Sequence, residues 1–238
     1  MDFRNIKMIV IIPLFAGVFC SLIICAYIGL YSGIIQRPEP VVVSEAEEEE
    51  EEEEELFLFS ASEKVPDPIL GYYRNPEYQS WVIDFITGIC SNPEIAQAIL
   101  AHCDYYQVPP ALALALCWEE SRFFPGAVNR SNRDGSIDRG LFQLNDRSFP
   151  NLQLAEFFNI YTNTRHGIAH LRFCLDTGGT EVSALAMYNA GTGRVRSTGA
   201  PYVTLNYISR ILDNRQKIES RFHARLIREE EMRLAARD

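Results

Sequence analysis

The stretch that decides the fold is Pro-Pro-Ala-Leu-Ala-Leu-Ala-Leu-Cys-Trp-Glu-Glu-Ser-Arg-Phe, residues 109–123. Its Ala-Leu alternation has a period of two, which by itself is typical of a strand. Ala and Leu are nevertheless strong helix formers, and no β-branched residue interrupts the run. Because a helix built from these residues is apolar on most of its faces, we expect it to lie buried at the centre of a domain.

Two neighbouring carboxyl groups, Glu119 and Glu120, finish this helix before Pro125-Gly126 ends it. A carboxylate at the end of a buried helix loses water and meets the negative end of the helix dipole, and both effects favour its protonated form. A general acid that works near neutral pH needs that form. Adjacent helical residues point about 100° apart, so at most one of the two enters a given cleft. Taken alone, a Glu at a helix end is more often a solvated residue.

The chain from Tyr78 onward is helical in pattern, with further helices predicted over residues 80–90, 92–106, 163–176, 181–188 and 203–219. In the second of these, Asn92 is the expected N-cap and Pro93 takes the first helical position. No alternating run rich in Val, Ile and Thr follows. We therefore predict a mostly α fold, with a domain over residues 78–220 and a helical tail over residues 221–238.

The tail continues an apolar stripe in which Ile218, Phe222 and Leu226 recur at four-residue spacing. Glu229 and Arg233 form an i,i+4 pair of opposite charge on the same segment. We expect the tail to prolong the last helix, with recruitment of a partner as the alternative.

A long run without a charged side chain, residues 8–35, precedes the domain. About 20 apolar residues suffice to cross a bilayer as a helix, so residues 1–35 are predicted to form a short N-terminus and a transmembrane anchor. A cleaved signal peptide is less consistent with the run, since its apolar region is usually about 7–15 residues long. Lipidation at Cys20 or Cys25 is disfavoured because bulky residues precede both. Basic residues before the span and acidic ones after it place the N-terminus in the cytoplasm.

Residues 36–77 are predicted to be an acidic linker that contains several prolines. The formal charge of the chain is −10, and the ten carboxylates of Glu45 and residues 47–55 account for all of it. A run of like charges repels itself, stays solvated and resists folding. The remainder of the chain is formally neutral and offers no basic patch, which argues against nucleic acid as a partner.

Two further motifs follow the carboxyl pair. Residues 140–143, Gly-Leu-Phe-Gln, form a Gly-led loop with an amide side chain, and residues 187–189, Met-Tyr-Asn, place a Tyr-Asn pair shortly before Gly191. Together with Glu120-Ser121 these segments can build a sugar cleft with one strong acid candidate.

The order of these motifs resembles the lytic transglycosylase domain shared by soluble lytic transglycosylases and goose-type lysozymes. In that family a Glu-Ser, a Gly-Leu-Met-Gln and an Ala-Tyr-Asn motif line one cleft. The similarity covers roughly residues 92–219, with residues 163–171 as the family's Asn-x-x-x-Gly-x-x-x-Leu helix and Tyr207-Ile208 similar to its later Tyr-Val element. The resemblance implies a lysozyme-like catalytic domain.

The resemblance assigns roles residue by residue. Glu120 takes the place of the sole catalytic acid/base, which leaves Glu119 as a structural or solvent-facing neighbour. The residues that the resemblance places at the substrate site are Ser121, Asn129, Phe142, Gln143, Tyr188, Asn189 and Tyr207.

Several of these positions carry a specific expectation. Ser121 is expected to fix the helix end, and Asn129 falls where relatives often carry Ser near the reacting N-acetyl sugar. Phe142 replaces the usual Met and is expected to offer an apolar platform for sugar. Gln143 and Tyr188 look like the groups that hydrogen-bond sugar and orient the acid, with the neighbouring Asn supporting the turn.

The implied reaction cleaves the β-1,4 bond between N-acetylmuramic acid and N-acetylglucosamine in peptidoglycan glycan strands and leaves 1,6-anhydromuramic ends. No water is consumed, so the paired carboxylates of ordinary glycosidases are not required. A hydrolytic muramidase is one alternative, in which Asp134 and Asp138 position a water, although a polar turn explains both residues more simply. A peptidoglycan-binding scaffold that does not cut is the other.

Residues 136–145 resemble the specialised transglycosylases that accompany cell-envelope secretion machines. This resemblance implies local wall opening during envelope assembly, with an envelope-assembly protein as a further partner. The anchor over residues 8–35 would then span a bacterial inner membrane once, with the catalytic domain on the periplasmic side.

No cofactor is implied, and no metal site is predicted. His166 and His170 lie four residues apart on one helical face, but Gly167 stands where a zinc-peptidase motif has its Glu. Four cysteines in an oxidising compartment allow three pairings, and the sequence does not choose among these pairings and free thiols. They are Cys90, Cys103, Cys117 and Cys174.

Overall fold

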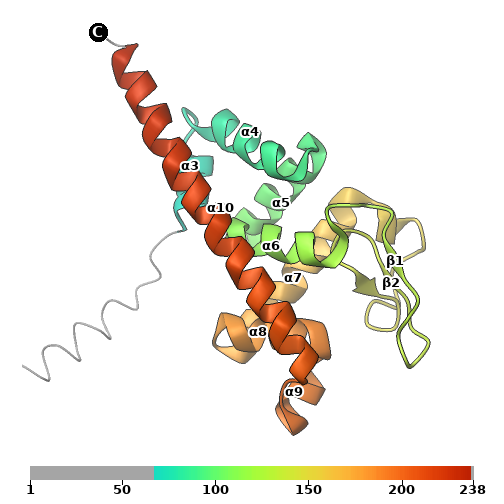
Figure 1. Cartoon of the computed structure of the whole chain (residues 1–238). Coiled ribbons are helices and arrows are strands. Elements are labelled where there is room, and N and C mark those ends of the chain that lie inside the picture. The colour runs from blue at the N-terminus through green and yellow to red at the C-terminus, as the bar shows by residue number, and fades with distance from the viewer. Residues whose placement is uncertain (1–66, 237–238) are drawn as a thin grey trace, which may run out of the picture. The chain divides into compact units, whose positions relative to one another are not determined.

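A computed structural model describes residues 67–236, which form a mostly helical domain, as predicted (Figure 1). The predicted anchor, residues 8–35, and the acidic run of the linker lie outside the described residues. Among the residues that are described, no helix combines the length and apolar character that a membrane crossing needs.

Every helix predicted between residues 80 and 219 is present, with bounds shifted by a few residues, except that the last one continues to Ala235. The helices are α3 (Pro68–Arg74), α4 (Gln79–Cys90), α5 (Pro93–Tyr106), α6 (Pro110–Ser121), α7 (Ile160–Gly178), α8 (Glu181–Ala190), α9 (Thr192–Thr198) and α10 (Tyr202–Ala235), with a 3₁₀ turn over Glu156–Phe158. Asn92 caps α5 as predicted, because its side chain accepts hydrogen bonds from the main-chain N–H groups of Glu94 and Ile95.

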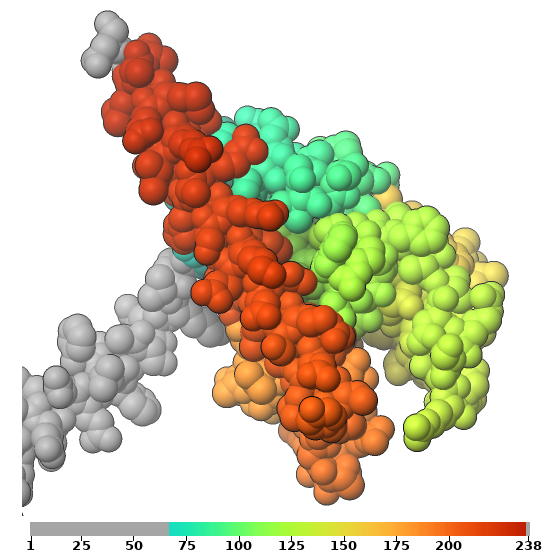
Figure 2. Space-filling view, viewed as in Figure 1, coloured from blue at the N-terminus to red at the C-terminus, as the bar shows by residue number. Residues whose placement is uncertain are grey.

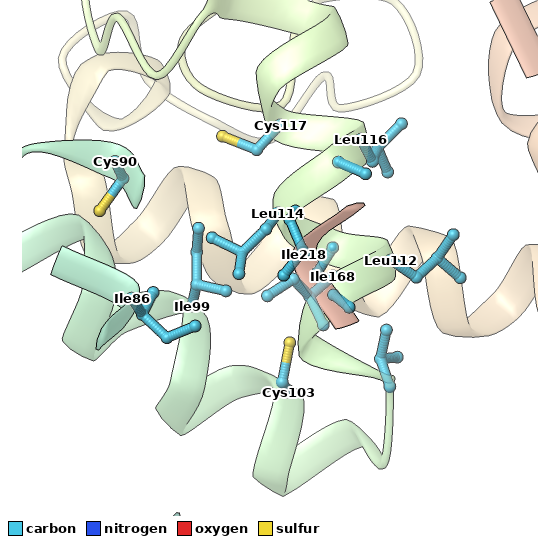
Figure 3. Packing of buried hydrophobic residues seen from close by; sticks show 14 of the residues in the cluster. Ile86, Cys90, Ile99, Cys103, Leu112, Leu114, Leu116, Cys117, Ile168 and Ile218 are labelled. Carbon is cyan, nitrogen blue, oxygen red and sulfur yellow. The ribbon is translucent and has the colours of Figure 1, made fainter. Parts of the chain in front are cut away.

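Helix α6 occupies the centre of the domain, as its composition predicts. All of its residues from Pro110 to Cys117 are buried, and α5 and α10 pack against it. Figure 3 shows Leu114 among isoleucines from other helices, including Ile99 of α5 and Ile168 of α7. A fully buried Leu contributes about 1.5–3 kcal/mol. The leucines of α6 therefore fix the helix that carries the carboxyl pair.

The predicted start of the domain at residue 78 is wrong, since helix α3 precedes it and packs into the core. Ile69 and Leu70 are buried, and Asp67 caps α3 by accepting a hydrogen bond from the main-chain N–H of Leu70 at 3.1 Å. Pro68 occupies the first turn of the helix, where the missing N–H costs nothing. Pro68, which the sequence assigned to the linker, is thus the first residue of a helix.

The C-terminal segment prolongs the last helix, as predicted, but it is part of the domain rather than a tail that begins at residue 221. Helix α10 runs without a break to Ala235, and Phe222 and Leu226 are buried on it. The Phe222 ring lies 5.4 Å from the rings of both Trp81 and Phe85 on α4. The second half of α10 therefore covers the face formed by α3 and α4.

Leu226→Ala is expected to destabilise the whole domain by about 2–3 kcal/mol, because it removes methyl groups from the core and leaves a cavity. Leu234→Ala, on the same helix, provides the matched control: Leu226 is 8% exposed and Leu234 is 64% exposed. Urea unfolding measures the difference in the free energy of unfolding between the two variants, provided that both have the same dependence of this free energy on urea concentration. Equal stability of the two variants would mean that the end of α10 does not belong to the core.

A small antiparallel sheet, which the sequence analysis did not predict, lies between α6 and α7 in the chain. Its strands are β1 (Val128–Asn129), β2 (Asp138–Arg139) and β3 (Leu144–Asn145), in the order β1-β2-β3. The register places Asn129 opposite Asp138 and Asp138 opposite Asn145. Strands of two residues are too short to show alternation in a sequence.

Candidate active site

A cleft of about 610 Å³ lies between the sheet segment and the chain around α8 and α9. In the space-filling view it opens between the segment that holds β1 and β2 and the chain around α9 (Figure 2). Four of the residues predicted for the site line it: Glu120, Gln143, Tyr188 and Asn189. The structure thus brings together side chains that are up to 69 positions apart in the chain.

Glu120 belongs to the last turn of α6 and faces this cleft. Burial raises the pKa of Glu120 from 4.5 to about 7, and the negative charges of Asp138 and Glu119 add to the effect. The Tyr207 hydroxyl opposes it by donating a hydrogen bond of 2.5 Å to Oε1 of Glu120. Burial and the nearby Glu120 hold the pKa of Tyr207 well above its usual range, so this hydroxyl stays a donor. A protonated carboxyl at neutral pH is suited to general acid catalysis.

Tyr207→Phe is expected to raise the pKa of Glu120 further, because it removes the donor that favours the carboxylate. Activity that needs protonated Glu120 declines as the pH rises through about 7. Loss of a hydrogen bond to a charged group corresponds to roughly one pKa unit or more, so the declining limb should move to higher pH by about that amount. Tyr202→Phe, an exposed tyrosine on the same helix, is the control. An unshifted limb would contradict the effect of the Tyr207 hydrogen bond on the pKa of Glu120.

Glu119 does not line the cleft and forms an ionic contact with α10. Its Oε1 lies 2.6 Å from Nη2 of Arg210, and its Oε2 lies 3.6 Å from Nη1 of Arg122. Only 8% of the Glu119 side chain is exposed. The expected structural role is consistent with these contacts, whereas the solvent-facing alternative is wrong. Helix α10 thus contacts both carboxyl groups at the end of α6.

The Gly-Leu-Phe-Gln loop is held by one buried amide. Oδ1 of Asn163 accepts a hydrogen bond from the Phe142 main-chain N–H at 2.8 Å. Its Nδ2 donates to the carbonyl oxygens of Arg139 at 3.0 Å and Phe157 at 2.8 Å. Since buried main-chain groups need partners, Asn163 satisfies three at once and fixes the loop that carries Gln143.

Two predicted site residues face the interior instead of the cleft. Phe142 has no exposed surface, because Gly167 on α7 leaves space into which its ring fits. The predicted sugar platform at Phe142 is therefore wrong. Ser121 is buried and donates a hydrogen bond of 3.2 Å to the Cys117 carbonyl oxygen within α6. This bond is consistent with fixing the helix end, but it places Ser121 away from the cleft.

A row of amides holds one carboxylate in the wall of the cleft. Asp138 lines the cleft and accepts hydrogen bonds from Nδ2 of Asn129 at 3.0 Å, of Asn132 at 2.9 Å and of Asn145 at 2.8 Å. Asn129 and Asn145 flank Asp138 across the sheet, so cross-strand pairing produces these bonds. Asn129 therefore acts on Asp138 and does not line the cleft itself. The sequence favoured Asp138 as a residue of a polar turn, but it lies on β2 and lines the cleft.

The remaining predicted residues bond to the protein through their polar atoms. Nε2 of Gln143 donates to the Gly140 carbonyl oxygen at 2.9 Å, and the Tyr188 hydroxyl donates to the Phe142 carbonyl oxygen at 3.0 Å. Oδ1 of Asn189 accepts a hydrogen bond from the Thr204 hydroxyl at 2.9 Å. Neither Gln143 nor Tyr188 hydrogen-bonds Glu120 here, and Tyr207 is the residue that does.

Several residues that line the cleft were not predicted from the sequence, among them Arg133, His170 and Arg194. The His170 ring lies 4.9 Å from the Tyr188 ring. Its position seven residues after Asn163 was a usable signal, because residues at that spacing share a helical face. The two arginines lie outside every recognised motif and gave no such signal.

The described part of the chain contains no group of three or more His, Cys, Asp or Glu residues suited to a metal ion. The four cysteines among the described residues are buried, and no disulfide joins them. Burial holds the pKa values of Cys103 and Cys117 well above the usual range, so both thiols stay protonated and inert.

A mostly helical domain with one acid of raised pKa over a polar cleft is consistent with the lysozyme-like class. Residues 97–207 match the family model of the transglycosylase SLT domain. The matched range contains Glu120 and ends at Tyr207, the residue that hydrogen-bonds it. This match supports the lytic transglycosylase family for the domain, and with it peptidoglycan as the class of substrate.

Proposed function

We propose that this protein is a peptidoglycan lytic transglycosylase in which Glu120 is the single general acid/base. The observation that supports this most directly is the setting of Glu120, a carboxyl group with a pKa raised to about 7 that lines a 610 Å³ cleft. A group with this pKa is present in both protonation states near neutral pH. It can therefore donate a proton in one step and accept one in the next.

The proposed reaction has two steps. Protonated Glu120 donates its proton to the glycosidic oxygen as the bond between N-acetylmuramic acid and N-acetylglucosamine breaks, and the N-acetyl oxygen of the muramic residue assists at the anomeric carbon. The Glu120 carboxylate then takes the proton of the muramic 6-hydroxyl, whose oxygen bonds to the anomeric carbon and displaces the N-acetyl oxygen from it. The products are a 1,6-anhydromuramic end and a new N-acetylglucosamine end, and Glu120 returns to its protonated state.

Residues around Glu120 have supporting roles in this proposal. The Tyr207 hydroxyl stabilises the carboxylate between the two steps. The Asp138 carboxylate lines the cleft and favours the positive charge that develops at the anomeric carbon. Gln143 and Tyr188 line the same cleft and are proposed to contact the sugar.

A hydrolytic muramidase remains the second candidate, and the placement of Asp138 in the cleft favours it over a non-cutting scaffold. In that reaction a water replaces the muramic 6-hydroxyl. Three amide donors already hold the Asp138 carboxylate in the wall, so it is better placed as a fixed charge than as a base that moves.

We further propose that residues 8–35 anchor the protein in a bacterial inner membrane and that the domain acts on the periplasmic side. The uncharged run and the basic residues before it, Arg4 and Lys7, support this topology. The resemblance of residues 136–145 to secretion-associated enzymes supports local wall opening during envelope assembly, with an assembly protein as partner.

Mass spectrometry of the fragments that the full-length protein releases from purified sacculi tests the reaction. Anhydromuramic ends are expected for the wild-type protein. Reducing muramic ends would replace the transglycosylase with a muramidase, and retention on sacculi without any release would replace both with a scaffold.

A further inference from the structure

Two arginines line the catalytic cleft from different segments of the chain. Arg133 lies in the connection between β1 and β2, and Arg194 lies on α9. Both residues are exposed. In the space-filling view these two segments form opposite sides of the cleft opening (Figure 2). The cleft therefore carries a positive charge on each side of its rim.

Neither arginine pairs with a carboxylate within residues 67–236. Their neighbours in the sheet segment behave differently. Arg139 lies 3.0 Å from Asp146, and Arg147 lies 3.2 Å from Asp134. The nearby arginines are thus neutralised by protein carboxylates, whereas those at the rim of the cleft are not.

None of the three acids that line the cleft forms an ion pair with Arg133 or Arg194. Asp134 is paired with Arg147, and Asp138 is held by three amide donors. Glu120 lies at the end of a buried helix, where Tyr207 holds it. An anion that satisfies Arg133 and Arg194 would therefore have to come from the ligand.

We propose that Arg133 and Arg194 bind carboxylates on the lactyl-peptide substituent of muramic acid, so that the cleft selects carboxylate-bearing strands. This inference rests on the proposed function of the same cleft. A guanidinium group binds a carboxylate through two parallel, charge-assisted hydrogen bonds, which are stronger than its hydrogen bonds to neutral sugar groups. The glycosidic bond must lie near Glu120, while the lactyl-peptide substituent projects from the strand and reaches the exposed rim.

Four single variants test the inference in the full-length protein. Arg133→Gln and Arg194→Gln each remove one rim charge. Arg130→Gln, in the segment of Arg133, and Arg196→Gln, on the helix of Arg194, remove the same charge at exposed positions that do not line the cleft. The measurement is kcat/KM on soluble peptidoglycan strands and on the same strands after their carboxylates are converted to amides.

The ratio of kcat/KM on untreated strands to kcat/KM on amidated strands is the readout. It should fall up to about fivefold for each rim variant and up to about 25-fold for the double variant, since partly exposed ion pairs contribute up to about 1 kcal/mol each. The control variants should keep the wild-type ratio. The wild-type preference should also shrink at high salt, because exposed charges are screened.

A third substrate tests which carboxylates the arginines use. In untreated strands the lactyl carbonyl is joined to the peptide as an amide, so the free carboxylates belong to the peptide, and an amidase that removes the peptide exposes a lactyl carboxylate in their place. If the dependence on the arginines is lost on the amidase-treated strands, the peptide carboxylates are the ligand; if it persists, a carboxylate next to the sugar ring is sufficient for binding.

A ratio near one for the wild-type protein, or equal loss on untreated and amidated strands in the double variant, would overturn the inference. Neither result would affect the proposed reaction, which depends on Glu120. Full cleavage by Glu120→Gln would instead overturn the reaction and leave the carboxylate preference measurable as binding to strands.

Discussion

Glu120→Gln is expected to lower kcat for strand cleavage by about a thousandfold or more. A positioned general acid or base contributes about 10²–10⁴-fold, and here one group serves in both steps. Gln keeps the size and the polarity of the side chain but can neither donate nor accept the transferred proton. The measurement is the rate of soluble fragment release from sacculi, with retention on sacculi as the check that substrate still binds.

Glu119→Gln is the matched control, one residue away on the same helix. Glu119 faces Arg210 and does not line the cleft, so this variant should keep most of the activity. Undiminished cleavage by Glu120→Gln, or a comparable loss in both variants, would refute the assignment of the acid.

Glu120→Gln is also expected to make the domain more stable at alkaline pH. The folded-state pKa of Glu120 is about 7, above the ordinary 4.5, so the folded protein binds the proton more tightly than the unfolded chain does. Glu120 therefore costs no stability at pH 4, and its cost grows as the pH rises from 4.5 through 7, up to about 3 kcal/mol. Glu120→Gln should match the wild-type protein at pH 4 and exceed its free energy of unfolding at pH 8. Equal stability of the two at pH 8 would contradict the raised pKa.

The sequence predicted the features that depend on neighbours within the same helix. Asn92 and Pro93 mark the start of α5 because a cap uses only the first few residues of a helix. Helical geometry alone could not identify which of Glu119 and Glu120 is the acid, because it says only that their side chains point in different directions. The motif Glu-Ser resolved it, and the structure places Glu120 rather than Glu119 at the cleft.

The errors concern residues whose surroundings come from distant parts of the chain. Phe142 is fully buried only because Gly167, on a helix that begins 18 residues later, leaves room for its ring. Pro68 resembled a linker residue because the partners that bury α3 lie elsewhere in the sequence. The rim charges Arg133 and Arg194 face one cleft only after folding. Such features depend on tertiary packing, which local pattern does not encode.

Gly140→Ala is expected to destabilise the domain by about 4 kcal/mol and to abolish most activity. Gly140 has a φ of +78°, in the left-handed region that costs other residues about 1–2 kcal/mol. A Cβ at this position would also overlap the Phe157 carbonyl oxygen and the Asn163 side-chain amide. Asn163 cannot move away without leaving the main-chain groups of Phe142 and Arg139 unpaired, which adds about 1–3 kcal/mol for each buried group.

Gly179→Ala separates the two contributions. Gly179, which caps the C-terminus of α7, has a φ of +71° in the left-handed region, but no atom would lie within 4 Å of a Cβ there. This variant should lose only the backbone contribution, about 1 kcal/mol, and keep its activity. Urea unfolding of both variants gives the difference, which measures the close contact between the loop and Asn163. If the two variants lost equal stability, the contact would be dispensable, and Asn163 would not be the residue that holds Gln143 and the loop against the cleft.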